Sequence, residues 1–335
     1  MIRDLDALIG ARLVVGIPGT IATDEVIEHL KHIRAGGLIP FARNLQSPEQ
    51  FRRLLSQLHD ALGRQVLVMV DHEGGRVVRF SSGVTQFPDA LTVGTTKEPG
   101  EVRQQGEIEA KELKALGVAV NLAPCVDVLV EGADPVIGTR SYGRDPQRVA
   151  SLGAARIQGM QRQGLAACAK HFPGIGAVPK DPHTSLPTVQ LDWSAMRHVH
   201  LVPFVEAIRV GVATLMSSHV CYPKLEPSSH TPATFSVRLM RDLLRGELGF
   251  EGVVLSDDLE MGALREVCSV GEAAVRAVEA GHDALLVCSD LAAQREVFEA
   301  LRVAYYDGRL PVEELERSVE RIRRLAEKFS HTKSP

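Results

Sequence analysis

The chain has 335 residues, of which 44% are hydrophobic and 24% charged, and its formal net charge is −4 at pH 7. This slight acidic balance gives no electrostatic reason to expect binding to nucleic acid or to a membrane surface, and no apolar run approaches the ~18 residues that a membrane-spanning helix requires. The amino terminus lacks the pattern of a secretory signal, and five cysteines without a Cys-x-x-Cys pair indicate reduced thiols. We therefore expect a cytoplasmic, enzyme-sized globular protein.

Short apolar runs recur along the sequence, and each is followed by a polar or glycine turn and then by a stretch with helical spacing. This alternation is typical of a parallel β-sheet. Eight runs are predicted to be strands: Leu13–Ile17, Gly37–Phe41, Val66–Val70, Val118–Leu122, Ala166–Ala169, Thr214–Ser218, Val253–Leu255 and Ala284–Val287.

Amphipathic stretches between these runs are predicted to be helices. Several begin near Ser, Thr or Asp, which cap helix amino termini, and end near glycine, which favours the left-handed turn that closes a helix. The predicted helices are Thr23–Ala35, Pro48–Leu62, Glu101–Leu116, Pro146–Gln163, Ser194–Val210, Val237–Leu248, Gly271–Ala280 and Leu291–Tyr306.

Eight strand-helix units match a closed (β/α)8 TIM barrel better than an open doubly wound sheet. The turn after the first strand, Gly16-Ile17-Pro18-Gly19, also lacks the G-x-G-x-x-G run of a dinucleotide site. A last amphipathic stretch, Val312–Phe329, is predicted to be an extra helix packed outside the barrel. Since no linker or shift in composition divides the chain, we expect one catalytic domain over residues 1–335.

Polar residues follow five of the predicted strands. In a TIM barrel the residues after the strands converge on one mouth, where the active site lies. In chain order these residues are Asp71-His72-Glu73-Gly74-Gly75-Arg76, Asn121-Leu122-Ala123-Pro124 with Asp127 close behind, Lys170-His171, Ser217-Ser218-His219, and Ser256-Asp257-Asp258-Leu259-Glu260.

Each of these groups also has a structural interpretation. Lys170 could belong to a buried ion pair, and His171 could be a hydrogen-bonded core histidine. Asp258 fits a helix cap or turn, and Asp127 a loop stabiliser. Arg140, in a long loop after the fourth strand, could be a surface charge. Their convergence on one mouth favours the functional interpretation more than any one residue does.

The triplet Asp181-Pro182-His183 lies in a long loop rich in proline and glycine. Pro182 favours extended backbone, in which residues two apart point the same way, so the Asp181 carboxylate can lie beside the His183 imidazole. A histidine held by a carboxylate has a raised pKa and suits general acid and base work near neutral pH. A turn with an exposed histidine is the alternative interpretation.

Over nearly its whole length, the sequence resembles the single-domain β-N-acetylglucosaminidases of glycoside hydrolase family 3, the NagZ type. The motifs that carry the resemblance occur in the family's order. They are Asp71-His72-Glu73-Gly74-Gly75-Arg76-Val77-Val78-Arg79, Ala123-Pro124-Cys125-Val126-Asp127-Val128, Ile137-Gly138-Thr139-Arg140-Ser141-Tyr142, Lys170-His171-Phe172-Pro173-Gly174, Asp181-x-His183, and Ser256-Asp257-Asp258-Leu259-Glu260-Met261.

The resemblance implies a retaining mechanism in which Asp257 is the nucleophile, while His183, oriented by Asp181, is the acid/base. It implies no metal and no cofactor, and it assigns the binding of the N-acetylglucosamine ring to Asp71, Arg79, Arg140, Lys170 and His171. This chain departs from the family pattern at Ile175, where relatives have a second histidine, and at Pro182, where they have serine. Neither position has an assigned chemical role, so we expect activity to survive.

The expected partner is a small carbohydrate with a terminal β-linked N-acetylglucosamine, either a muropeptide or a chito-oligosaccharide, and no nucleic-acid or membrane partner is expected. The sequence does not give the oligomeric state, and a monomer is compatible with it. A family 3 β-glycosidase of other specificity, an N-acetylglucosaminide phosphorylase and a non-catalytic sugar-binding barrel remain alternatives. A metal-dependent hydrolase is disfavoured by the irregular spacing of its candidate ligands, His171, His183, His219, Asp71 and Asp257.

Overall fold

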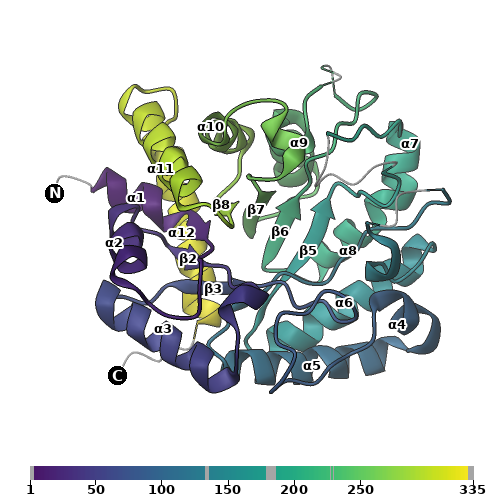
Figure 1. Cartoon of the computed structure of the whole chain (residues 1–335). Helices are drawn as coiled ribbons and strands as arrows, with labels where there is room; N and C mark the ends of the chain where they lie inside the picture. Colours follow the sequence, from purple (N-terminus) through teal and green to yellow (C-terminus); the bar gives the residue numbers. More distant parts are fainter. Residues whose placement is uncertain (1–3, 133–135, 179–185, 227, 229, 331–335) are drawn as a thin grey trace.

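The computed structural model describes residues 4–132, 136–178, 186–226, 228 and 230–330. Eight parallel strands close into a barrel in which each strand pairs with the next and β8 pairs with β1 (Figure 1). The predicted (β/α)8 barrel is therefore confirmed. Its strands are β1 (Leu13–Val15), β2 (Gly37–Leu38), β3 (Leu67–Val70), β4 (Val120–Asn121), β5 (Ala166–Phe172), β6 (Thr214–Ser217), β7 (Val253–Asp258) and β8 (Ala284–Val287).

All eight predicted runs contain a strand, but β5 and β7 continue past their predicted ends. Lys170, His171 and Asp257 consequently lie within strands rather than after them. The register of β5 against β6 shifts between Lys170 and Phe172, and that of β7 against β8 shifts between Leu255 and Asp258. Such bulges reorient a side chain and are frequent next to active sites.

The helices surround the barrel (Figure 1). They begin and end as predicted to within a few residues, except that Ser194–Val210 is divided into three segments. Three short helices, α1, α4 and α9, were not predicted. The α-helices are α1 (Leu5–Ala11), α2 (Asp24–His32), α3 (Pro48–Leu62), α4 (Ala90–Thr96), α5 (Pro99–Ala115), α6 (Pro146–Arg162), α7 (Trp193–Ala195), α8 (Val202–Arg209), α9 (Gly262–Arg265), α10 (Val270–Ala280), α11 (Leu291–Tyr306) and α12 (Val312–Phe329).

Five further helical segments have 3-10 or π hydrogen bonding. They are η1 (Ala42–Asn44), η2 (Gly138–Arg140), η3 (Met196–His200), η4 (Ala233–Phe235) and η5 (Arg238–Glu247). Helix α3 illustrates the predicted helix ends. The Ser47 side chain accepts a hydrogen bond from the Gln50 amide at its start, and Gly63 closes it in the left-handed conformation at a φ of 64°.

The buried apolar side chains form two clusters. One fills the inside of the barrel, and the other fills the layer between the strands and the helices. Along β3, Leu67 and Met69 belong to the interior cluster, whereas Val68 and Val70 belong to the cluster that the helices cover. This alternation follows from the two-residue period of a strand. The interior is thus filled with apolar side chains.

Helix α12 lies across the end of the barrel at which the strands begin. Its Leu325 and Phe329 belong to the interior cluster, and its Val319 and Ile322 line a surface hollow together with Leu67 at the start of β3. The sequence predicts this helix and its place outside the strands, but not the end of the barrel that it covers, because an apolar stripe does not say which surface it packs against. No helix in the described part of the chain is long and apolar enough to cross a membrane.

Candidate active site

A pocket of about 440 Å³ opens at the carboxyl ends of the barrel strands. This volume is within the range of small-molecule sites. The predicted residues that the structure describes line one and the same pocket: Asp71, Arg79, Arg140, Lys170, His171 and Asp257. Asp181 and His183 lie outside the described residues.

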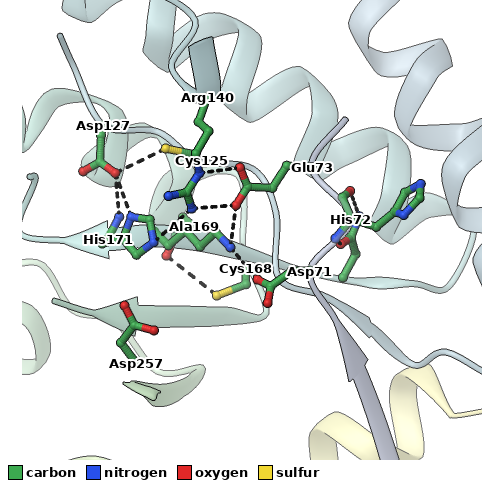
Figure 2. A network of polar contacts seen from close by, with 12 residues as sticks. Asp71, His72, Glu73, Cys125, Asp127, Arg140, Cys168, Ala169, His171 and Asp257 are labelled. Atoms are coloured by element: carbon green, nitrogen blue, oxygen red, sulfur yellow. Dashed lines mark hydrogen bonds and ion pairs between the residues drawn. The ribbon is translucent and has the colours of Figure 1, made fainter. Parts of the chain in front are cut away.

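Lys170 contacts two carboxylates in the pocket wall, those of Asp71 and Glu73, which are labelled in Figure 2. Its Nζ lies 2.7 Å from Asp71 Oδ1 and 2.7 Å from Glu73 Oε1, and its side chain is only 2% exposed. Burial opposes the charged form, but the carboxylates of Asp71 and Glu73 outweigh it and raise the pKa of Lys170. The pocket therefore has a permanent ammonium in a fixed position.

Glu73 fixes Arg140 as well as Lys170. Arg140 Nε lies 2.9 Å from Glu73 Oε2 and Arg140 Nη2 2.7 Å from Oε1, a two-point contact that sets the plane of the guanidinium. Although burial alone would raise the pKa of Glu73, Arg140 and Lys170 hold it well below its usual value. With a side chain 13% exposed, Arg140 is not the surface charge of the structural interpretation.

Glu73 is not among the site residues predicted from the sequence. The one signal for it is its position two residues after Asp71, in a turn that is closed by Gly74 and Gly75, both with positive φ. A carboxylate so close to Asp71 in the chain can bind the same lysine, Lys170. The sequence does not show that Glu73 also binds Arg140, which lies 67 positions away.

His171 is oriented by Asp127. His171 Nδ1 lies 2.8 Å from Asp127 Oδ2, and its backbone amide donates to the same oxygen at 3.2 Å. With Nδ1–H donated to the carboxylate, Nε2 is left toward the pocket, 3.4 Å from Arg140 Nη2. Burial alone would raise the pKa of Asp127, but His171 and the Ile175 amide keep it lowered. Asp127 thus does more than stabilise a loop, because it sets the direction of an imidazole in the pocket wall.

Ile175, where this chain departs from its relatives, contributes through its backbone. Its amide donates to Asp127 Oδ1 at 2.7 Å, and its side chain is buried in the main apolar cluster. The preceding Gly174 carbonyl accepts a hydrogen bond of 2.9 Å from the Tyr222 hydroxyl. An apolar side chain therefore suits this position, and the hydrogen bond to Asp127 does not depend on its identity.

Asp257 lies at the β7 bulge and faces the same pocket. It lies across from His171 in Figure 2, where no dashed contact joins it to the network around Lys170. Its Oδ1 accepts a hydrogen bond of 2.8 Å from the Asp258 amide. Burial alone would raise the pKa of Asp257. Nearby groups, His171 and His219 first among them, have the opposite and together stronger effect, so the pKa is lowered. The carboxylate is therefore ionised at neutral pH.

The neighbouring carboxyl group of Asp258 behaves differently. Burial, assisted by Glu260 and Asp257, raises its pKa to about 7. Its Oδ1 accepts hydrogen bonds from the amides of Glu260 at 3.1 Å and Cys288 at 3.2 Å. Asp258 is thus a turn former and not a helix cap, since α9 begins beyond Met261. Two adjacent carboxyls with different pKa values are suited to different tasks.

Arg79 is held between Asp71 and Phe41. Its Nη2 lies 3.3 Å from Asp71 Oδ2, and its guanidinium carbon lies 5.2 Å from the centroid of the Phe41 ring. Arg43 contacts the same ring at 4.7 Å. Among the described residues, the buried Nε of Arg79 has no hydrogen-bond partner. Phe41 was not predicted as a site residue, because the turn after the second strand shows no evident chemistry.

One group of described residues brings potential metal ligands together: Cys125, Asp127 and His171, with ligand atoms within 4.8 Å of one another. It shares only His171 with the metal site considered from the sequence. Cys125 Sγ donates to Asp127 Oδ2 at 3.2 Å, and burial, together with Asp127, raises the pKa of the thiol well above its ordinary value. A protonated thiol is a poor metal ligand, so the group is described better as a hydrogen-bond network.

Comparison with known proteins gives a consistent result. Residues 8–325 match the family model described as the glycosyl hydrolase family 3 N terminal domain. A beta-hexosaminidase of Nitrosomonas eutropha is 38% identical over 296 residues, which cover 87% of this chain and 84% of that protein. A beta-hexosaminidase of Pseudomonas aeruginosa is 37% identical over 291 residues, which cover 87% of this chain and 86% of that protein.

Two solved structures are similar over nearly the whole chain. A glycoside hydrolase family 3 beta-N-acetylglucosaminidase from Paenibacillus superposes with a TM-score of 0.95 at 38% identity, over 98% of this chain and 63% of that one. NagZ from Neisseria gonorrhoeae, in complex with N-trifluoroacetyl-D-glucosamine, superposes with a TM-score of 0.83 at 31% identity, over 96% of this chain and 91% of that one. The chain thus spans less than two thirds of the Paenibacillus protein but most of the Neisseria protein.

Proposed function

Because this chain belongs to glycosyl hydrolase family 3, we propose that it is a β-N-acetylhexosaminidase that removes terminal β-linked N-acetylglucosamine with retention of configuration. The observation that supports this most is the placement of an ionised Asp257 in the same pocket as the fixed cations Lys170 and Arg140. The proposal covers one catalytic domain that acts in the cytoplasm on a muropeptide or chito-oligosaccharide, without metal or cofactor.

In the first step Asp257 is the nucleophile. Its carboxylate attacks the anomeric carbon, and the bond to the leaving oxygen breaks as the covalent glycosyl-enzyme forms. A nucleophile needs to be deprotonated and rigidly placed. The lowered pKa of Asp257 and its position on β7, with the Asp258 amide bound to Oδ1, support both requirements.

His183 is proposed to protonate the leaving oxygen and then to take a proton from the water that hydrolyses the intermediate, with Asp181 as its orienting carboxylate. Support comes from the sequence pattern and from the anchoring of the chain on either side. Before the triplet, the Gly176 carbonyl accepts a hydrogen bond from the Val130 amide at 3.0 Å; after it, the Val189 amide donates to the Cys221 carbonyl at 2.9 Å.

The sugar ring is proposed to bind against the polar wall of the pocket. Asp71 and Lys170 supply an acceptor and a donor side by side, as the hydroxyl groups of a pyranose require. His171 Nε2, Arg140 and Arg79 Nε, which has no hydrogen-bond partner among the described residues, add directional groups around them. Apolar side chains line another part of the pocket, among them Ile39, Phe41, Met216, Met261 and Leu286.

Hydrolysis of a chromogenic aryl N-acetyl-β-D-glucosaminide tests this function. Wild type should release the aryl group, and Asp257→Ala should lose nearly all of that activity. Asp258→Asn is the matched control, because it changes the adjacent carboxyl while leaving the nucleophile. Equal rates for wild type and Asp257→Ala would contradict the assignment. An inactive wild type that binds N-acetylglucosamine would support the non-catalytic alternative, and product that carries phosphate at the anomeric carbon would identify a phosphorylase.

A further inference from the structure

A second, smaller cavity lies at the opposite end of the barrel from the pocket, where the strands begin. It measures about 100 Å³ and is lined by five arginines from three parts of the chain. Arg12 immediately precedes β1, Arg241 and Arg245 lie on η5, and Arg317 and Arg321 lie on α12. Gly281, His282 and Asp283, between α10 and β8, complete much of the lining.

Asp283 is already saturated by its partners. Its Oδ2 lies 2.5 Å from Arg245 Nη2 and accepts a hydrogen bond of 2.8 Å from the Val254 amide, while its Oδ1 lies 3.0 Å from Arg321 Nη1. The carboxylate is buried. Its single negative charge can therefore offset only part of the two positive charges of Arg245 and Arg321, and none of the charge of the other arginines.

Glu314 is the second carboxylate in the cavity. It binds Arg241 through both of its oxygens, at 2.8 and 2.5 Å, and lies 3.6 Å from Arg317 Nη2. The contact with Arg241 has the two-point geometry that arginine forms with oxyanions. Glu314 thus compensates mainly Arg241, and Arg317 is held only loosely.

Arg12 has no carboxylate partner within salt-bridge distance in the described part of the chain. It is 1% exposed and donates to the backbone carbonyls of His282 and Asp283 and to the Tyr305 hydroxyl. Burial, helped by Arg12 and Arg245 among its neighbours, lowers the pKa of His282 to about 3, so this histidine adds no charge at neutral pH. Glu314 acts on Arg12 only from beyond salt-bridge distance. A buried guanidinium without a carboxylate in direct contact is costly, because burial removes the water that stabilises it.

Five guanidinium groups against two carboxylates leave an excess of three positive charges around the cavity. The exposed carboxylate of Asp242 attracts Arg241 electrostatically; even if its charge is counted in full, an excess of two positive charges is left. The cavity has about a quarter of the volume of the pocket at the other end of the barrel, 100 Å³ against 440 Å³, so it suits one small group rather than a whole metabolite.

We propose that this cavity binds a tetrahedral oxyanion such as inorganic phosphate. Arginines recognise phosphate oxygens through paired N–H donors, and an anion here would compensate the charge that the two carboxylates leave. It would connect α12 and η5 to the segment that precedes β8. Since β8 pairs with β1 to close the barrel, the bound anion would stabilise that closure.

Thermal unfolding of the full chain tests this proposal. The melting temperature is measured against inorganic phosphate, with sodium chloride at matched ionic strength as reference. Wild type should show a saturable rise in phosphate beyond that in chloride, since a ligand that binds only the folded state raises its stability. Arg317→Gln, at a side chain 63% exposed, should fold normally and weaken the apparent affinity about tenfold, as the loss of one charged hydrogen bond would.

Arg323→Gln is the matched control on the same helix, because Arg323 pairs with Glu320 and does not line the cavity. The Arg323→Gln variant should show the same rise of melting temperature in phosphate as wild type. The double variant Arg317→Gln with Arg321→Gln should show no rise beyond that in chloride. Glycerol 2-phosphate distinguishes a free anion from a phosphomonoester: a response to phosphate that exceeds the response to the ester assigns the free anion, and a larger response to the ester would assign the ester. A phosphate response no larger than the chloride response, or one that persists in the double variant, would overturn the proposal.

Discussion

The carboxylate of Glu73 holds the guanidinium of Arg140 by two hydrogen bonds, of 2.9 and 2.7 Å, in the wall of the pocket. The same carboxylate contacts Lys170, so one buried acid positions two of the cations proposed to bind the sugar. Its importance comes from orientation, since it lies behind the groups that would touch substrate.

We therefore predict that Glu73→Gln lowers kcat/KM by about 10- to 100-fold, mainly through KM. The amide keeps the shape but loses the charge, and a hydrogen bond between charged groups contributes about 1.5–3 kcal/mol. Steady-state kinetics on the aryl glycoside give the result, with Glu251→Gln, at an exposed position, as control. A Glu73→Gln enzyme with unchanged KM would show that the ion pairs only stabilise the fold.

A second prediction concerns Phe41, whose ring contacts the guanidinium of Arg79. Phe41→Leu should raise KM about 3- to 10-fold, because a cation–π contact of about 0.5–2 kcal/mol that orients Arg79 is lost. Phe41→Tyr retains an aromatic face and should restore the wild-type KM. If the leucine and tyrosine variants have the same KM, Phe41 serves only to fill space.

The raised pKa of Asp258 predicts how stability depends on pH. Between the ordinary pKa of 3.8 in the unfolded chain and about 7 in the folded protein, only the folded state holds this proton. The contribution of Asp258 to stability is therefore lost as pH rises through this window. Asp258→Asn, which cannot ionise, should gain stability relative to wild type between pH 4 and 8, by on the order of 2–4 kcal/mol. Urea unfolding across this range measures the difference, and a difference that does not change with pH would refute the prediction.

The acid/base role that we propose for His183 predicts a dependence on the leaving group. His183→Ala should lose most activity on disaccharides, whose leaving oxygen needs a proton, and much less on an activated aryl glycoside. The ratio of the two rates in the variant and in wild type is the measurement. An equal loss on both substrates would mean that His183 has a structural role or acts mainly as the base in the second step.

The barrel could be predicted because each strand is a short apolar run with a turn behind it, and the runs repeat in a regular order. The ends of β5 and β7 could not be predicted. The residues that extend these strands, Lys170 and Asp257 among them, are polar and interrupt the apolar pattern. These same residues point into the mouth from strand bulges, so the prediction is least accurate where the site lies.

The motifs around Asp71, Lys170 and Asp257 identify the residues that line the pocket, but they do not show which of those residues bind each other. The pairing of Glu73 with Arg140 joins two loops that only the closed barrel brings together. The position of α12 is a similar case: its apolar stripe predicts a helix, while its contact with the interior cluster depends on the open end of the finished barrel.

The most direct test of the central claim is to trap the glycosyl-enzyme with a 5-fluoro N-acetylglucosaminyl fluoride. Its ring fluorine slows both steps, but its reactive fluoride leaving group keeps formation of the intermediate faster than hydrolysis. Mass spectrometry of the digested protein should then find one added sugar on the peptide that contains Asp257, and none in Asp257→Ala. A label on another carboxylate, or turnover that persists in Asp257→Ala, would contradict the account.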